Sequence, residues 1–241
     1  MPELVIGSRS IPYEVRRSLK AGRKRIEVSP RGVEVIVPYH TSSQDVERFV
    51  QRKRRWLHDK TIEVQEDIER LRAETPQGFH SGAKILFRGR YLRLRVSTGK
   101  VEKPTLKYRT AFHVQLPRDF SNGQQEPVVR SLVEEWLENR LAEDAWEVVR
   151  RRGTPHGLEP RSVQVRDQRT LWGSCGRDGV VRIDSKLVRV PRPVFEYVMV
   201  HELCHLRHRD HSTAFWDLVK RILPDYEERK AWLEQHEVEV G

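Results

Sequence analysis

The sequence predicts an α+β protein, with a β-rich N-terminal half followed by a helical C-terminal half that contains a small sheet. Short β-branched and alternating runs dominate the chain up to about residue 120. From Val128 the apolar residues recur at helical spacing instead. With 241 residues, 37% of them hydrophobic and 33% charged, the chain can bury a core beneath a densely charged surface. We therefore divide it into residues 1–120, a β-rich region with one helix, and residues 121–241, which should carry the chemistry.

The N-terminal region should begin with four strands followed by a helix. The strands are Leu4–Ile6, Ile11–Val15, Arg25–Val28 and Val33–Val37. Ser42 or Ser43 can cap a helix that starts near Gln44 and continues in pieces to Leu71. We expect Lys53–Arg55 on its polar side and Trp56 packed inward.

A second group of strands follows, and no internal repeat is visible in the sequence. The expected strands are Ile85–Phe87, Tyr91–Val96, Leu106–Tyr108 and Phe112–Leu116, with a turn at Gly89. Pro117–Pro127 is the best candidate for a linker because it is rich in turn-forming residues.

The C-terminal half should hold a long helix, a small sheet and three shorter helices. The expected elements are a helix from Val128 to Val149, strands at Val163–Val165 and Val180–Ile183, a helix opened by Pro191 or Pro193, a short helix capped by Ser212, and a last helix from Pro224. Val180–Ile183 is a candidate edge strand.

The helix opened by Pro191 or Pro193 carries the sequence His201-Glu202-Leu203-Cys204-His205. Residues i and i+4 share one helix face, so His201 and His205 can aim two imidazoles at one metal ion. Zinc accepts imidazole nitrogen, and Glu202 can take a proton from a metal-bound water. The surrounding residues are apolar nearly all round, which predicts a buried helix. Burying an unpaired charge costs free energy, so metal binding would explain why these polar residues lie on a buried helix.

A third protein ligand has several candidates. His211 is favoured, because six residues beyond His205 let the chain leave the helix and fold back. His208 lies about 10 Å along a continuing helix from His201 and is better explained as a solvated residue at the helix end. Four glutamates near the C-terminus are the remote alternatives: Glu227, Glu228, Glu234 and Glu237. The His208 position and the absence of a methionine after the motif exclude an ordinary metzincin.

These motifs in their order resemble the YgjP-like metallopeptidases, which are related to the SprT-like and WLM zincins. The C-terminal matching segments are Trp172–Cys175, Val200–Leu206, His211-Ser212, Phe215-Trp216, Pro224–Tyr226 and Trp232-Leu233. The N-terminal ones are Pro38, Lys53–Leu57 and Arg88–Leu94. The resemblance implies a zincin-like C-terminal half, Zn²⁺ bound by His201, His205 and His211, and Glu202 as the general base.

A peptidase of this kind would hold a polypeptide substrate along an edge strand by main-chain pairing. Trp172, Ser174 and Tyr226 are the residues expected on the substrate side, with packing as their competing role. Tyr197 and Tyr226 are unranked candidates for stabilising an oxyanion. Cys175 follows a glycine-containing turn, so we also considered it as a regulatory metal ligand.

Net charge and the absence of targeting signals limit which partners and which compartment we expect. The net charge of +10 would allow weak nucleic-acid binding through a basic surface, but a solvated arginine-rich surface is the favoured interpretation. Two cysteines without a Cys-x-x-Cys pair, no signal peptide and no apolar run of about 20 residues predict a cytoplasmic protein without a membrane span.

Three alternatives compete with this interpretation. The same metal and base could hydrolyse a nucleoside triphosphate to release pyrophosphate, although no phosphate-binding glycine loop is present. A nucleic-acid-associated protease of the SprT-like kind is the second. A non-catalytic zinc module is the third, and Glu202 argues against it because a structural site has no use for a carboxylate beside an open position.

Overall fold

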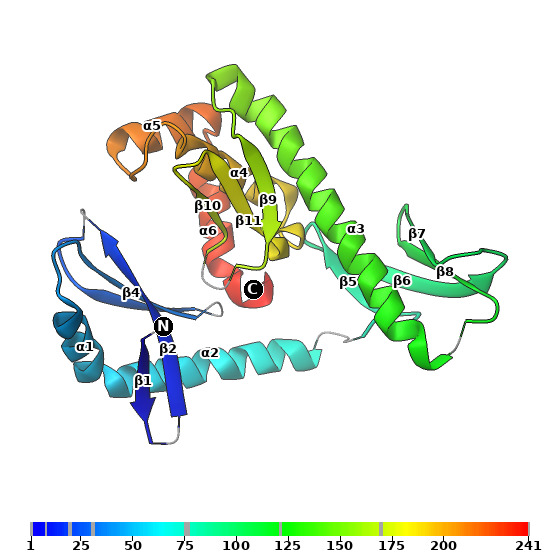
Figure 1. The fold of residues 1–241 in the computed structure, drawn as a ribbon, viewed down its shortest axis with the longest axis horizontal. Coiled ribbons are helices and arrows are strands. Elements are labelled where there is room, and N and C mark those ends of the chain that lie inside the picture. The colour runs from blue at the N-terminus through cyan, green and yellow to red at the C-terminus, as the bar shows by residue number, and fades with distance from the viewer. Residues whose placement is uncertain are drawn as a thin grey trace.

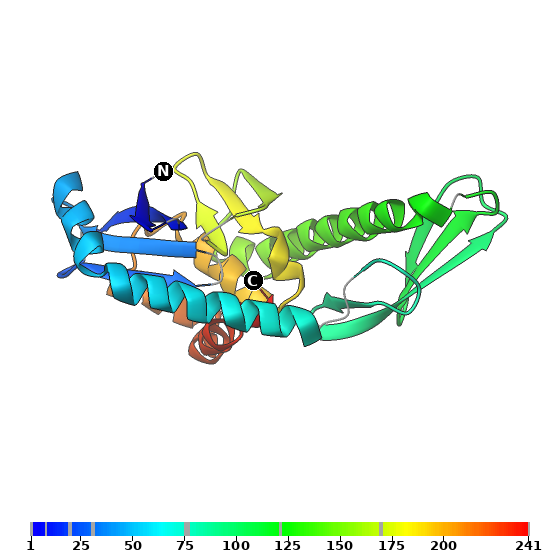
Figure 2. The ribbon, with the colours of Figure 1, turned by 90° about the horizontal axis from the view of Figure 1, so that it is seen from below.

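The computed structural model describes residues 2–240 except positions 8, 19–20, 30–31, 75–77, 121 and 169–170. The predicted α+β class is confirmed: a β-rich N-terminal half precedes a C-terminal half of helices around a small sheet. The two four-stranded sheets lie at opposite ends of the molecule, with α3 and the C-terminal elements between them (Figure 2). None of the described helices combines the length and the apolar character needed to cross a membrane.

The first sheet has the strand order β1-β2-β4-β3, with β2 and β4 parallel. Its strands are β1 (Glu3–Ile6), β2 (Arg9–Ser18), β3 (Arg25–Ser29) and β4 (Gly32–Pro38). Two helices, α1 (Ser43–Arg52) and α2 (Arg54–Glu74), follow where one was expected. Ser42 caps α1 by accepting a hydrogen bond from the Asp45 amide at 3.1 Å.

This sheet has its own hydrophobic core. Val35, Val37, Val46, Val50 and Leu57 are among its buried members. The expectation for Trp56 was wrong: its side chain is 47% exposed, because Leu57 occupies the inward position instead. Lys53 interrupts the helix between α1 and α2, so the residues of this corner project outward.

The second sheet repeats the topology of the first. Its strands are β5 (Lys84–Phe87), β6 (Arg90–Gly99), β7 (Thr105–Tyr108) and β8 (Phe112–Pro117). The order β5-β6-β8-β7 has the same two antiparallel pairs around a parallel pair as the first sheet. The parallel pairs begin at equivalent residues, Tyr13 with Val33 and Leu94 with Phe112. The chain therefore contains a structural repeat that the sequence did not reveal.

Helix α3 (Gln125–Val148) packs on this sheet and runs to the C-terminal elements (Figure 1). Phe87, Phe112 and Trp136 meet edge to face at its sheet end. The expected linker is shorter than predicted, since η1 (Asn122–Gln124) and the first turn of α3 occupy its second half. A π-turn (Val149–Gly153) and η3 (Thr154–His156) end the helix.

The small sheet has the order β10-β11-β9. Its strands are β9 (Ser162–Arg166), β10 (Gly173–Cys175) and β11 (Val180–Asp184). Val180–Ile183, the candidate edge, lies at the centre, and β10 is the edge beside the helix that carries His201. That helix is α4 (Arg192–Cys204), followed by α5 (Thr213–Ile222), α6 (Tyr226–Gln235) and α7 (Glu237–Val240). Ser212 precedes α5 as predicted but makes no side-chain cap.

The β5–β6 hairpin anchors the second sheet to the start of α4. The amides of Arg88 and Gly89 donate to the carbonyls of Val188 and Arg189, at 2.9 and 2.6 Å. A Cβ at Gly89 would lie 2.8 Å from the Pro191 ring, so glycine is required for this approach. One buried cluster accordingly runs from Ala83 to Val240, separate from that of the first sheet. The division at residues 120 and 121 stays a proposal about how the chain is organised.

Candidate metal centre

Helix α4 places His201 and Glu202 inside the protein, as its apolar surroundings predicted. Pro191 and Pro193 stand at its start, and every residue from Val194 to Val200 is buried. The helix ends at Cys204, which leaves His205 in the cap position. The chain then turns, so that residues after His205 can fold back over the helix.

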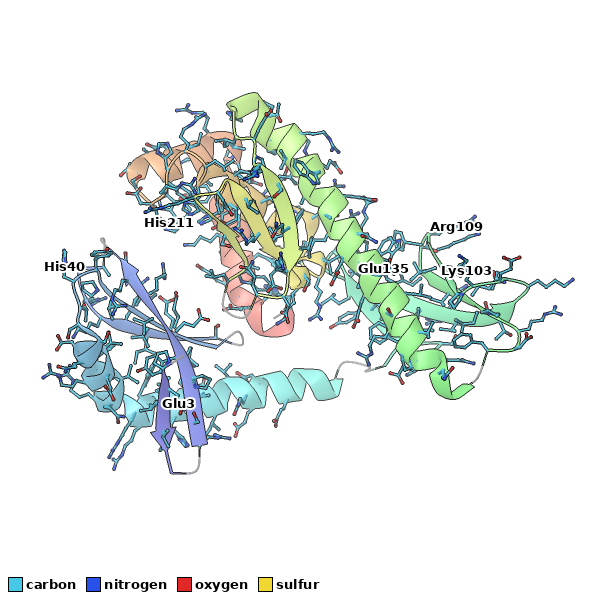
Figure 3. The ribbon with its side chains drawn as sticks, viewed as in Figure 1. Glu3, His40, Lys103, Arg109, Glu135 and His211 are labelled. Atoms are coloured by element: carbon cyan, nitrogen blue, oxygen red, sulfur yellow. The ribbon has the colours of Figure 1, made fainter. Side chains whose placement is uncertain are left out.

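His211 returns to the two histidines of α4. The ligand nitrogens of His201, His205 and His211 all lie within 4.8 Å of one another, and the Nε2 atoms of His201 and His211 are 3.0 Å apart. Tetrahedral zinc, bound at roughly 2.0–2.1 Å, holds two ligand nitrogens about 3.3 Å apart. The His201–His211 pair is close to this spacing, and three imidazoles are a donor set that zinc and other divalent metal ions accept. Figure 3 shows His211 among the C-terminal helices, away from the second sheet, whose loops carry Lys103 and Arg109.

The remaining candidates do not join this cluster. His208 contributes its main-chain carbonyl, which lies 2.8 Å from Nδ1 of His205. This contact assigns the Nδ1 proton to His205 and leaves its Nε2 lone pair for a metal. None of the described glutamates of α6 and α7 belongs to the group of metal-binding residues. Cys175 does not belong to it either.

Burial keeps His201 neutral. It lowers the pKa of this imidazole well below its usual value, and the neighbouring His205 and His211 lower it further. Its Nδ1 is buried and has no hydrogen-bond partner among the described residues. A neutral imidazole is the form that binds a metal ion.

Two aromatic residues of α5 surround the histidines, and residue-by-residue reasoning had assigned them no role. The fully buried Phe215 ring lies 4.6–4.9 Å from all three imidazoles, measured between centroids. Trp216 stacks on His211 at 5.7 Å. The sequence signal that could have identified them is their position four and five residues after His211, at the start of the next helix. They form an apolar wall that fixes the imidazole planes.

Glu202 is buried beside the edge strand. Burial raises the pKa of its carboxyl group to about 8. A bound divalent cation would favour the ionised form. Its side chain lies directly against Gly173 of β10, where a Cβ would come within 2.9 Å of Oε1. Glycine at position 173 therefore makes room for the carboxyl group.

Strand β10 turns part of its main chain to an open edge. Its ladder to β11 is flanked by bonds from Asp184 N to Trp172 O and from Gly176 N to Val180 O. Because antiparallel ladders alternate, Ser174 pairs with β11, and the polar groups of Gly173 and Cys175 face outward. Arg209 donates to the carbonyls of Cys175 and Gly176, at 3.2 and 2.8 Å. This contact ties the loop that carries His211 to β10.

The expected substrate-side residues lie in different settings. Trp172 is half-buried against the main core, and Ser174 lies 3.5 Å from Gln168. Tyr226 stacks on Trp216 and lines a groove of about 430 Å³ with Trp216, Lys230, Ala231, Glu227 and Glu234. Burial raises the pKa of Tyr226, and its hydroxyl donates to Glu227 at 3.1 Å. Tyr197 is buried, and burial raises its pKa too.

Glu196, five residues before His201, anchors α4 from behind. Its carboxylate accepts from Arg152 at 2.8 Å, from Arg229 at 2.7 Å and from Arg151. Burial alone would raise the pKa of this carboxyl group, but the three arginines outweigh it and hold the pKa at about 2. The end of α3, helix α4 and helix α6 are thereby joined at one buried group.

The three histidines form a group that could hold a metal ion. The family of YgjP-like metallopeptidase domains matches residues 23–236, and the chain belongs to this family. Among solved structures, the metallopeptidase zymogen abylysin of Pyrococcus abyssi is 20% identical with a TM-score of 0.32. The match covers 40% of this chain and 92% of abylysin. The comparison with curated proteins found no match.

Proposed function

We propose that this metallopeptidase is zinc-dependent, with His201, His205 and His211 as zinc ligands and Glu202 as general base. The observation that carries the proposal is the convergence of three imidazoles within 4.8 Å beside a buried carboxyl group. Three neutral nitrogen donors with one coordination position left open are typical of catalytic zinc. A structural site would close that position with a fourth protein ligand.

Bound zinc would polarise a peptide carbonyl and lower the pKa of its water to about 7. Glu202 would accept the proton from that water and pass it to the leaving amine. The close contact with Gly173 limits where the carboxyl group can point. Between Tyr197 and Tyr226, we favour Tyr226 for stabilising the oxyanion, since it lines the groove while Tyr197 is buried.

An extended polypeptide would bind along the outer edge of β10. Main-chain pairing needs an edge whose amides and carbonyls point outward, as those of Gly173 and the amide of Cys175 do, while the Cys175 carbonyl already accepts from Arg209. The groove beside Trp216 and Tyr226 would take a substrate side chain. Ser174 stays a substrate-side proposal, whereas the contacts of Trp172 favour a packing role.

The test compares wild-type protein with Glu202→Gln, both loaded with zinc, on unstructured polypeptides mixed with nucleoside triphosphates. Mass spectrometry follows new peptide ends and pyrophosphate together. We expect new peptide ends from the wild type and at least about 100-fold fewer from the variant, the scale of general-base catalysis. Glu228→Gln, an exposed glutamate on α6, is the matched control and should cleave normally.

Two outcomes would reject parts of the proposal. Pyrophosphate release that requires Glu202, without new peptide ends, would make the site a phosphohydrolase. Equal cleavage by Glu202→Gln and wild type would remove Glu202 from the mechanism. Metal analysis of the purified protein, with cobalt and manganese as competitors, tests zinc separately.

A further inference from the structure

The outer face of the second sheet carries aligned rows of basic residues. Arg95, His113 and Lys107 lie in register across β6, β8 and β7, and Lys84 lies opposite Arg93 across β5 and β6. The intervening residues Leu94, Phe112 and Val114 are buried against α3, so these five side chains point to the opposite face. All are exposed except His113, which is half-buried.

Acidic residues are missing from this face. Residues 83–117, all of them described, contain nine lysines and arginines against one acidic residue, Glu102, which lies in the β6–β7 loop. None of the five aligned residues makes an ion pair with a described residue. Like charges opposite each other destabilise a sheet, so this arrangement has a cost to the fold. A partner that brings negative charge would remove that cost.

The first sheet provides an internal comparison. Its residues equivalent to Arg95, His113 and Lys107 are Glu14, Glu34 and Glu27, which lie in register in the same way. There, Arg16 pairs with Glu34 and Arg25 with Glu27, each at 2.7 Å. The repeat therefore has a mixed, internally paired face in one copy and a face of arginine, lysine and histidine in the other. The topology itself does not require the cations.

An aromatic side chain continues the cationic strand. Tyr91 precedes Arg93 and Arg95 on the same face of β6, opposite the half-buried Leu86, and is 44% exposed. An open four-stranded sheet with exposed aromatic and basic residues can stack unpaired bases and contact their phosphates. Neighbouring cations would be about 4.8 Å apart across strands and about 6.7 Å apart along β6. Several phosphates could therefore be contacted together.

We propose that the outer face of β5-β6-β8-β7 binds single-stranded nucleic acid, with Arg93, Arg95 and Lys107 on phosphates and Tyr91 on a base. Single strands are favoured over duplexes because stacking on Tyr91 requires an unpaired base. An acidic polypeptide could use the cations but has no comparable use for the exposed ring. In Figure 3, Lys103 and Arg109 mark the β7 side of this sheet, remote from His211. Bound nucleic acid would thus leave the metal centre accessible.

The test is fluorescence anisotropy of the full-length protein with labelled oligothymidylate and oligouridylate of about 15 nucleotides. Wild-type affinity should fall linearly with the logarithm of salt concentration, with a slope of about −2 to −3, since each phosphate contributes about −0.7. Arg93→Glu/Arg95→Glu should weaken binding at least about 10-fold and reduce the slope by about 1.4. The new glutamates would face Lys84 and His113, so the fold should be retained.

Lys220→Glu/Arg221→Glu on α5 changes the net charge equally, also at exposed positions, and should bind within about twofold of wild type.

Tyr91→Ala should weaken oligonucleotide binding about 10-fold without changing the affinity for polyglutamate. Equal weakening by the two charge-reversal variants would overturn the proposal, because binding would then follow net charge alone. Polyglutamate or anionic vesicles that bind as tightly as the oligonucleotides would overturn it in favour of another polyanion. Comparison of the two oligonucleotides separates DNA from RNA.

Discussion

Gly173 and Glu202 lie in contact, and the contact leaves no space for a side chain at position 173. A Cβ there would come within 2.7 Å of Glu202 Cγ and 3.0 Å of its carboxyl carbon. Glu202 sits on a helix packed on every side, so it cannot retreat without changing where its carboxyl oxygens point. An edge strand of the small sheet thus positions the group that we propose as the base.

Gly173→Ala should therefore lower peptide hydrolysis while zinc stays bound. A displacement of the base by about 1 Å can reduce the rate on the order of 100-fold. The measurement is kcat together with metal content. Gly123→Ala is the matched control, because nothing lies within 4 Å of a Cβ at that position. Normal kcat in the Gly173 variant would show that the carboxyl group is not held by this contact.

His211→Ala should lose zinc, whereas His208→Ala should retain it. The imidazole of His211 reaches the other two histidines, but His208 contributes only a main-chain carbonyl that alanine preserves. We expect zinc affinity to fall by more than about 100-fold in His211→Ala, which exceeds the usual loss when a residue that only orients a ligand is changed. In His208→Ala it should fall by less than about threefold. Competition with a chromophoric chelator measures both. The reverse order of affinities would reject His211 as the ligand.

Arg209→Met should weaken zinc binding without touching a ligand. Arg209 joins the loop between His205 and His211 to two carbonyls at the end of β10. Residues that orient ligands typically change metal affinity about 10- to 100-fold, and we expect the lower end because Arg209 is exposed. Arg209→Lys should recover part of the loss, and Arg221→Met should have no effect. If Arg209→Met left the zinc affinity unchanged, Arg209 would have no part in positioning the zinc ligands.

Glu196→Gln should destabilise the protein at neutral pH and much less in acid. A carboxyl group with a pKa of about 2 when folded and 4.5 when unfolded contributes about 3 kcal/mol above pH 4.5. That contribution is lost as the pH falls from about 4.5 toward 2, because the folded state must then bind a proton. Urea unfolding at pH 7 and at pH 3 should show the difference between variant and wild type shrinking.

Glu134→Gln is the control for this measurement, since its ion pair with Arg130 is exposed and spans 3.9 Å. Its effect should stay below about 0.5 kcal/mol at both pH values. A pH-independent effect of Glu196→Gln would mean that packing, and not the charge, accounts for the loss of stability.

Local spacing along the chain was sufficient to predict several features of this protein. The i, i+4 separation of His201 and His205 and the apolar residues around them specify a buried helix with two imidazoles on one face. Alternation specified both sets of strands, and the motif order pointed to the family. The chain reversal after His205 made His211 the favoured third residue, and its imidazole does meet the other two.

Contacts between segments that are distant in the sequence could not be predicted from local patterns. Gly173 touches Glu202, and Arg209 reaches β10, because sheet and helix pack together, and no local pattern encodes either contact. The repeat was hidden because strand pairing preserves register while side chains diverge, as Glu34 and His113 illustrate. Trp56 was misplaced because two neighbouring apolar side chains compete for one inward position, and the break at Lys53 gave that position to Leu57. Spacing along the chain fixes which side chains share a face, whereas packing fixes what that face meets.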